Sequence, residues 1–295
     1  MLNIHDIMFA RIGPAGRVVA QRASCVCVVE DVMGVTQLRD VVYVVSVAGW
    51  SSAIRRYNAT THQRLTDIAI MGWCYPCDIA SCELTSQLYV SDIRGCVWRV
   101  SSDAADIHRV YKQCWLPKSR PDRFRPWKLS ITSSRLLVTP QDGRQLRQFD
   151  AAGGDELRRV GLPDYMSPLH AVESPIATFI VGHYNTQLRQ YQVSEVSTEG
   201  QVLREFSGSL GGPVHIAVDR QGNIFVAIVA DSDKHHILLL DAQLALRRVI
   251  IDERQLNNRH PFRLCYTDQS GQLLVCRHIG DFRDCGVAVF DVLQR

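Results

Sequence analysis

Hydrophobic and polar residues alternate in short runs along most of the chain, and Gly, Pro, Asn, Asp or Ser bounds many of these runs. Alternation with a period of two is typical of β-strands that bury one face. Runs such as Gln87–Val90 and Asn223–Val226 are rich in β-branched and aromatic residues, which fit a pleated, half-buried surface. The pattern therefore predicts an all-β fold built from many short strands.

The strand pattern recurs at a regular interval. Prolines open five of the copies, at spacings of 50, 42, 45 and 48 residues: Pro76, Pro126, Pro168, Pro213 and Pro261. Propeller blades repeat about every 40–50 residues. With a degenerate first copy, the six copies cover residues 24–70, 75–112, 124–163, 166–206, 211–251 and 259–295. We therefore expect residues 1–295 to form a single six-bladed β-propeller of four-stranded antiparallel blades.

The ends of the chain raise the question of ring closure. The last copy runs out shortly after Asp291, so it lacks an outer strand of its own. We expect an N-terminal strand, at about residues 16–20, to complete this blade and close the ring. The first copy would then begin with an innermost strand at residues 25–29, followed by strands at residues 41–45 and 53–57.

Composition favours one globular domain. Apolar residues make up 46% of the chain and charged residues 21%, and the formal net charge is +3. No apolar stretch is long enough for a membrane span, and the first residues lack the basic-then-apolar layout of a signal peptide. We therefore expect a cytoplasmic monomer with no membrane partner. Several of the ten cysteines fall inside predicted strands, so we expect reduced thiols.

One copy of the repeat resembles a known repeat family. The run Pro213-Val-His-Ile-Ala-Val-Asp219, then Gly222-Asn-Ile-Phe-Val-Ala227 and His236-Ile-Leu-Leu-Leu-Asp241, resembles the NHL repeat. The resemblance implies a six-bladed propeller similar to the C-terminal propeller of tripartite-motif proteins, which binds protein or RNA. The first 75 residues hold only three cysteines and no paired zinc-ligand spacing, so a RING finger is missing. Any role in ubiquitin-ligase pathways would therefore come from a partner.

One position of the repeat predicts a binding site. It is the second residue after each opening proline, and it should start every innermost strand and so ring one mouth of the channel. Its occupants, with Ser24 in the first copy, are Asp78, Lys128, His170, His215 and Arg263. One acid among these cations predicts a mostly positive mouth that attracts anionic partners. The alternative is that these side chains pair with backbone carbonyls.

A basic connection precedes the third copy. Residues 118–128 gather five basic side chains beside two aromatic rings, which could contact phosphates and stack on bases. The candidate nucleic-acid contacts are Lys118, Arg120, Arg123, Phe124, Arg125 and Trp127. The alternative is a solvated loop, because a net charge of +3 is small for a dedicated nucleic-acid binder.

Two motifs suggest enzymes. Trp73-Cys-Tyr-Pro-Cys77 looks like a thioredoxin-type motif, but a strand follows it instead of the helix that would activate the first thiol. His170 and His215 match zinc-ligand positions of peptidyl-hydroxyglycine lyases, which share this fold, but the third position holds another residue. We therefore predict no catalytic residues, metal or cofactor.

These observations rank three hypotheses. The first is a non-enzymatic protein or peptide interaction scaffold that uses one face of the propeller. The second is RNA binding through a basic channel mouth and residues 118–128. The third is a metal-dependent lyase-like or hydrolase-like enzyme.

Overall fold

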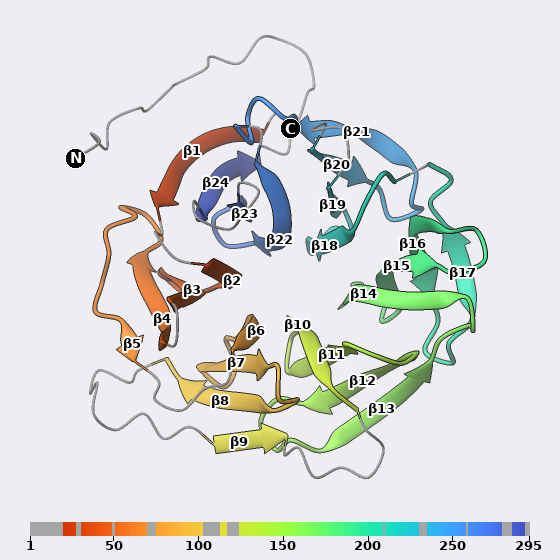
Figure 1. Cartoon of the computed structure of the whole chain (residues 1–295), viewed down its shortest axis with the longest axis horizontal. Coiled ribbons are helices and arrows are strands. Elements are labelled where there is room, and N and C mark those ends of the chain that lie inside the picture. The colour runs from red at the N-terminus through yellow and green to blue at the C-terminus, as the bar shows by residue number, and fades with distance from the viewer. Residues whose placement is uncertain are drawn as a thin grey trace.

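The computed structural model describes residues 20–27, 31–48, 51–69, 75–102, 113–116, 124–208, 210–229, 235–257, 259–278 and 285–292. Six four-stranded antiparallel sheets stand around a common centre like the blades of a propeller (Figure 1). In each sheet, strands that are consecutive in the chain are neighbours, except at the blade that closes the ring. The predicted six-bladed architecture is confirmed.

Each blade begins with an innermost strand at the centre of the ring and ends with an outermost strand. In this order, blade 1 contains β2 (Asp31–Leu38), β3 (Val41–Ala48), β4 (Ser51–Asn58) and β5 (Ile68–Ala69). Blade 2 contains β6 (Pro76–Cys82), β7 (Gln87–Asp92), β8 (Val97–Ser101) and β9 (Gln113–Leu116). Blade 3 contains β10 (Pro126–Thr132), β11 (Arg135–Pro140), β12 (Gln145–Asp150) and β13 (Glu156–Gly161).

The second half of the ring follows the same order. Blade 4 contains β14 (Met166–Glu173), β15 (Phe179–Asn185), β16 (Gln190–Val196) and β17 (Val202–Glu205). Blade 5 contains β18 (Val214–Val218), β19 (Ile224–Ile228), β20 (His236–Leu240) and β21 (Leu246–Ile251). Blade 6 contains β22 (His260–Thr267), β23 (Gln272–His278), β24 (Gly286–Val292) and β1 (Ala20–Cys27).

An N-terminal strand closes the ring, as expected, but it lies further along the chain than predicted. Strand β1 pairs with β24 from Ala20 opposite Val292 to Cys27 opposite Gly286. The sequence placed this strand at residues 16–20 and used residues 25–29 for blade 1, whose innermost strand is in fact β2. The alternating run at residues 25–29 suits either position, because its period does not distinguish an inner strand from an outer one.

Each interface between neighbouring blades has its own hydrophobic core. One cluster joins Val44 of blade 1 to Leu274 of blade 6, and another joins Phe225 of blade 5 to Phe290 of blade 6. Four similar clusters fill the remaining interfaces. Because both faces of a blade pack on a neighbour, the second strands are buried almost throughout and read as continuous apolar runs.

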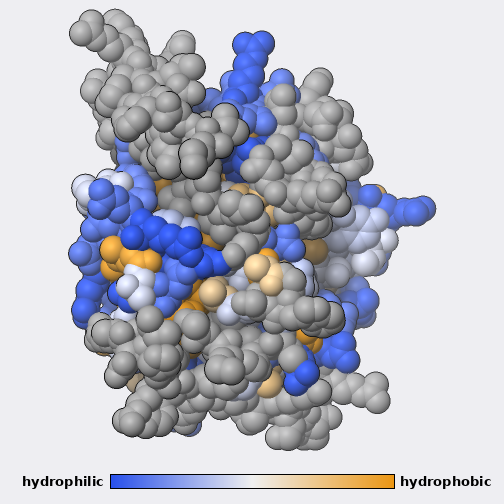
Figure 2. Space-filling model, turned by 60° about the vertical axis from the view of Figure 1, so that its left-hand side comes forward, coloured by the Kyte–Doolittle hydropathy of each residue, from blue (hydrophilic) through white to orange (hydrophobic). Residues whose placement is uncertain are grey.

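The outer surface carries few large apolar side chains. Figure 2 shows one side of the molecule, where the coloured surface is mostly hydrophilic and hydrophobic residues form small separate patches. Exposed residues such as Leu84, Leu157 and Leu246 come from different blades. Scattered apolar side chains are ordinary on a protein surface. Among the described residues, no helix has the length and hydropathy needed to cross a membrane.

Candidate functional site

The repeated position after each proline does bring side chains together at the centre of the ring. At the start of five innermost strands the pairing register shifts by one residue, as at a β-bulge. A bulge re-aims the side chain that follows it. The residues directly after these shifts are Gly34, Asp78, Lys128, His170 and Arg263, and His215 occupies the corresponding place in blade 5, where the register is regular.

Arg263 crosses the centre and connects four blades. Its Nε donates to Asp78 Oδ1 of blade 2 at 2.8 Å, and its Nη2 donates to the Leu129 carbonyl of blade 3 at 2.7 Å. Its Nη1 lies 3.1 Å from the Leu264 carbonyl and 2.9 Å from Nε2 of His170 in blade 4. The guanidinium is therefore a hub that ties blade 6 to blades 2, 3 and 4.

Asp78 is the partner that balances the charge of Arg263. Its carboxylate is fully buried and also accepts hydrogen bonds from the backbone N–H groups of Ile79 and Leu129, each at 2.9 Å. A buried ion pair is stable only when further hydrogen bonds satisfy its remaining atoms, and these three donors do so for the carboxylate.

The two histidines differ in their surroundings. His170 is fully buried, and its Nδ1 accepts a hydrogen bond from the Ile216 N–H at 3.2 Å. Burial, together with the nearby charge of Arg263, holds the pKa of His170 well below its usual range. His215 keeps partial exposure and its ring centroid lies 6.1 Å from that of His170. Surrounding protein, then the charges of Lys128 and Arg263, also hold the pKa of His215 well below its usual range.

Lys128 is buried beside the ion pair of Arg263 and Asp78. Its ammonium donates to the Cys77 carbonyl at 3.0 Å, and Nζ lies 5.6 Å from the centroid of the Trp127 ring. Burial lowers the pKa of Lys128, although the charge of Asp78 opposes this shift. The alternative that ring side chains bind backbone carbonyls therefore holds for Lys128 and Arg263.

The first blade departs from the sequence prediction. Ser24 was expected in the ring, but it lies on β1, the outermost strand of blade 6, opposite Val289. Gly34 takes its place, and a Cβ there would lie only 2.7 Å from Asp78 Oδ1. Sequence reasoning missed Gly34 because blade 1 has no opening proline. A glycine inside a strand is itself a sign of close approach, and this signal was present.

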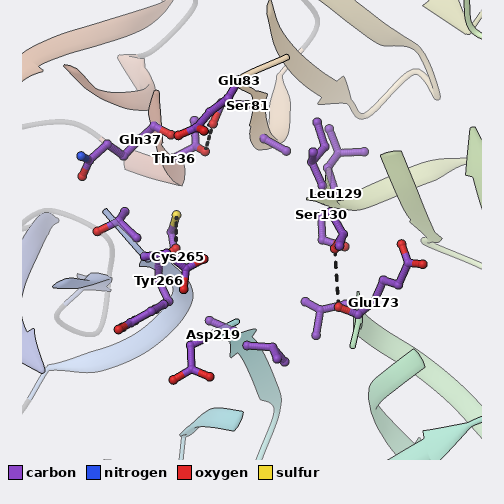
Figure 3. Close-up of a pocket in the computed structure, with 18 of the residues that line it drawn as sticks. Thr36, Gln37, Ser81, Glu83, Leu129, Ser130, Glu173, Asp219, Cys265 and Tyr266 are labelled. Atoms are coloured by element: carbon purple, nitrogen blue, oxygen red, sulfur yellow. Dashed lines mark hydrogen bonds between the residues drawn. The ribbon is translucent and has the colours of Figure 1, made fainter. Parts of the chain in front are cut away.

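A pocket of about 730 Å³ opens beside the ring, and its wall is formed by the innermost strands of all six blades. Arg263 lines it, whereas Asp78, Lys128, His170 and His215 do not. Asp78, Lys128 and His170 are buried, and His215 is partly exposed but does not line this pocket. A channel mouth formed by these four residues stays a prediction. Residues that do form the wall lie around the opening in Figure 3.

Short polar side chains join neighbouring blades along the pocket wall. Ser81 donates to the Gln37 carbonyl at 2.8 Å and lies 2.8 Å from the Thr36 hydroxyl. Ser130 donates to the Ala171 carbonyl at 2.9 Å. A hydroxyl that donates one hydrogen bond can still accept others, so the wall retains acceptors for a ligand.

The charges at the pocket rim are balanced. Arg135 pairs with Glu173 at 2.7 Å, and Arg220 pairs with Asp268 at 3.2 Å. Asp219 accepts from the backbone N–H groups of Gln221 and Asn223 at its own turn. The described part of the pocket rim therefore presents no surplus of either sign.

The basic connection is only partly described. Lys118, Arg120 and Arg123 lie outside the described residues. The ring of Phe124 lies 4.2 Å from the guanidinium carbon of Arg147, and the Arg125 side chain is 61% exposed. Trp127 is half-buried and contacts Lys128. Of the described candidates, only Arg125 offers a fully accessible cation.

The Cys-x-x-Cys motif shows no activated thiol at its second position. Cys77 is fully buried in β6, and burial raises its pKa to about 12. A thiol with such a pKa is a poor nucleophile at neutral pH. Cys74 lies outside the described residues. Over the described part of the chain, no group of three His, Cys, Asp or Glu side chains is placed to hold a metal ion.

Comparisons with known proteins support the fold. No protein-family model matches the chain, and no curated protein matches its sequence. Hydrazine synthase from Kuenenia stuttgartiensis is a structural neighbour, with a TM-score of 0.58 and 12% identity over 84% of this chain and 74% of the other.

Two further neighbours are propeller domains. The WD40 β-propeller domain of Doa1 gives a TM-score of 0.55 and 13% identity over 93% of this chain and 97% of the other. The β-propeller domain of Cps50 (Swd1) from Myceliophteria thermophila gives a TM-score of 0.58 and 8% identity over 93% of this chain and 100% of the other. Identities this low show the fold alone. The chain is thus a β-propeller, while its membership of the NHL family stays a prediction.

Proposed function

We propose that this chain is a non-enzymatic binding module that holds a peptide segment of a partner protein in the central pocket. The observation that carries the proposal is the pocket itself, about 730 Å³ in volume and lined by all six blades. Ligand-binding pockets usually measure about 300–1,000 Å³. Rigid strands form the wall, so the pocket is preorganised for its ligand.

The lining suits a peptide of mixed character. Hydroxyls from Thr36, Ser130 and Thr132 alternate with apolar side chains such as Ile131 and Val218. Peptides offer both backbone hydrogen-bonding groups and apolar side chains, so they match both components of this wall. Paired rim charges favour a segment of low net charge over a polyanion.

RNA binding is the second hypothesis, and its strongest predicted contacts are buried. Lys128 and Arg263 lie in the interior and bond to carbonyls and to Asp78, which leaves Arg125 as the accessible cation among the described candidates. A metal-dependent lyase-like or hydrolase-like activity is the third. Further parts of the proposal are an NHL-type repeat, a cytoplasmic monomer, and a partner that supplies any link to ubiquitin-ligase pathways.

The test is selection from a random peptide display library on three forms of the protein: wild type, Thr132→Trp and Thr60→Trp. Thr132 lines the pocket, and its hydroxyl makes one long hydrogen bond at 3.5 Å, so an indole there occupies part of the pocket at small structural cost. Thr60 is exposed in a turn of blade 1 and provides the matched control.

The pocket predicts a common set of enriched peptides on wild type and Thr60→Trp, and loss of this set on Thr132→Trp. Melting temperature confirms that all three proteins are folded. Equal enrichment on all three forms would place peptide binding elsewhere. Absence of any enrichment, with salt-sensitive retention of mixed RNA that Arg125→Glu weakens, would favour the second hypothesis.

A further inference from the structure

Among the described residues at the repeated position, positive charge exceeds negative charge. Among the five polar side chains at the repeated position, Asp78 is the one acid, and Arg263 neutralises it at 2.8 Å. Three donors already occupy the carboxylate, namely Arg263 Nε and the backbone N–H groups of Ile79 and Leu129. Asp78 is therefore matched, and the remaining groups need another counterpart.

Lys128 is the cation without a matching charge. Its burial is nearly complete, yet the Cys77 carbonyl is the one acceptor that its ammonium contacts in the described structure. An ammonium group carries three N–H donors, so two of them have no acceptor among the described residues. Burying a charge without a partner is costly, and an ion of opposite charge removes this cost.

His215 adds a second unmatched group at the repeated position, and its ring centroid lies 6.1 Å from that of His170. Its Nδ1 is buried and has no hydrogen-bond partner in the described structure, while part of the side chain stays exposed. Lys128 is the nearby charge that affects His215 most, followed by Arg263, so the three groups share one electrostatic environment. Neither His215 nor Lys128 lines the peptide pocket.

The contact between Arg263 and His170 already has an acceptor. Nδ1 of His170 accepts from the Ile216 N–H, so a neutral ring carries its proton on Nε2, which lies 2.9 Å from Nη1 of Arg263. The Leu129 carbonyl accepts from Arg263 Nη2 at 2.7 Å and is also a hydrogen-bond partner of His170. Lys128 and His215 are therefore the groups that still need a counterpart.

We propose that the centre of the propeller is a binding site for one small monovalent anion of the size of chloride, which Lys128 and His215 contact beside Arg263. A cation does not fit, because the ammonium and guanidinium groups repel it and offer no lone pair. Monovalent charge fits, because Lys128 and Arg263 together exceed Asp78 by one positive charge. A divalent anion would leave one negative charge buried. Lys128 and His215 do not line the peptide pocket, so the anion site does not rest on the proposed function.

The first experiment compares thermal unfolding of the full chain in sodium chloride and in sodium gluconate at equal concentration. Gluconate is a monovalent anion that is much larger than chloride, so it controls for ionic strength. An affinity of about 1 mM predicts that about 100 mM chloride raises the folding equilibrium constant roughly 100-fold. We expect Lys128→Met, which keeps the side-chain length and removes the charge, to abolish this difference between the two salts. Arg125→Met removes an exposed cation and should retain it.

A second experiment does not depend on the folding of a variant. Crystals of the wild-type protein grown in sodium bromide should give an anomalous peak between Lys128 Nζ and the His215 ring. Equal stability in chloride and gluconate, or a chloride effect that Lys128→Met retains, would overturn the proposal. A bromide-containing crystal with no anomalous peak at this position would overturn it as well.

Discussion

Replacement of Gly34 by alanine tests whether the ion pair at the centre of the ring holds the blades together. A Cβ at this position would lie 2.7 Å from Asp78 Oδ1, 3.0 Å from the Ile79 nitrogen and 3.2 Å from Ile79 Cγ2. Real contacts of a methyl group with these atoms are longer, so the carboxylate or strand β2 has to move. The carboxylate is also the group that Arg263 contacts at 2.8 Å.

The expected loss combines two terms. Overpacking a well-filled interior costs about 1–3 kcal/mol, and breaking a buried ion pair outright costs about 3–5 kcal/mol. Alanine displaces Asp78 without removing it, so we expect the free energy of unfolding to fall by about 3 kcal/mol. Urea denaturation followed by tryptophan fluorescence measures this difference.

Gly161→Ala is the matched control, because a Cβ at Gly161 meets no atom within 4 Å. This residue lies at the exposed end of β13, and alanine there should change stability by less than about 1 kcal/mol, in the stabilising direction. Equal stability of the Gly34→Ala and Gly161→Ala proteins would refute the reasoning, because the crowding at Asp78 would then carry no cost.

Three other predictions concern single groups. Tyr89 donates to the Ala151 carbonyl at 2.5 Å and so joins blade 2 to blade 3. Tyr89→Phe should lower the free energy of unfolding, measured by urea titration, by about 1–2 kcal/mol. An unchanged midpoint of unfolding would contradict this prediction. Burial lowers the pKa of His183 from 6.5 to about 4. Below pH 6.5 this histidine is therefore protonated in the unfolded chain but not in the folded protein, and the free energy of unfolding falls as the pH decreases towards 4. His183→Gln should reduce this slope by about 1.4 kcal/mol per pH unit, measured by urea titrations between these pH values, and an identical slope would contradict it. Burial and a pKa of about 12 should protect the Cys77 thiol from reaction with DTNB. Cys77→Ala should therefore leave the number of thiols that react rapidly at pH 8 unchanged. The loss of one rapidly reacting thiol in this variant would indicate an accessible thiolate at Cys77.

The sequence was sufficient for the architecture because each blade repeats the same local pattern. Opening prolines mark the starts of blades, and the register shifts of β6, β10, β14 and β22 follow them directly. The position after each shift could therefore be predicted to meet at the centre. In blade 1 no proline marks the start, and an alternating run at residues 25–29 was assigned to the wrong strand.

Burial of the central side chains could not be predicted from local sequence. Arg263 contacts Asp78 and His170, which lie 185 and 93 positions away in the chain. Whether a cation near the start of a strand is exposed depends on residues from several other blades. Sequence alone therefore showed that charged groups converge, while their pairing and their removal from solvent became visible only in the folded ring.

The charged residues at the centre hold the blades together, whereas Thr132 on the pocket wall has no such role. Arg263 joins blade 6 to blades 2, 3 and 4, and Lys128 joins blade 3 to blade 2 through the Cys77 carbonyl. Reversing both charges, as in Lys128→Glu/Arg263→Glu, would bury carboxylates beside Asp78 and destabilise the fold. If this double variant failed to bind a partner, the failure would therefore reflect unfolding of the propeller and would not locate the binding site. Thr132, on the pocket wall, makes one long hydrogen bond and can report on binding alone.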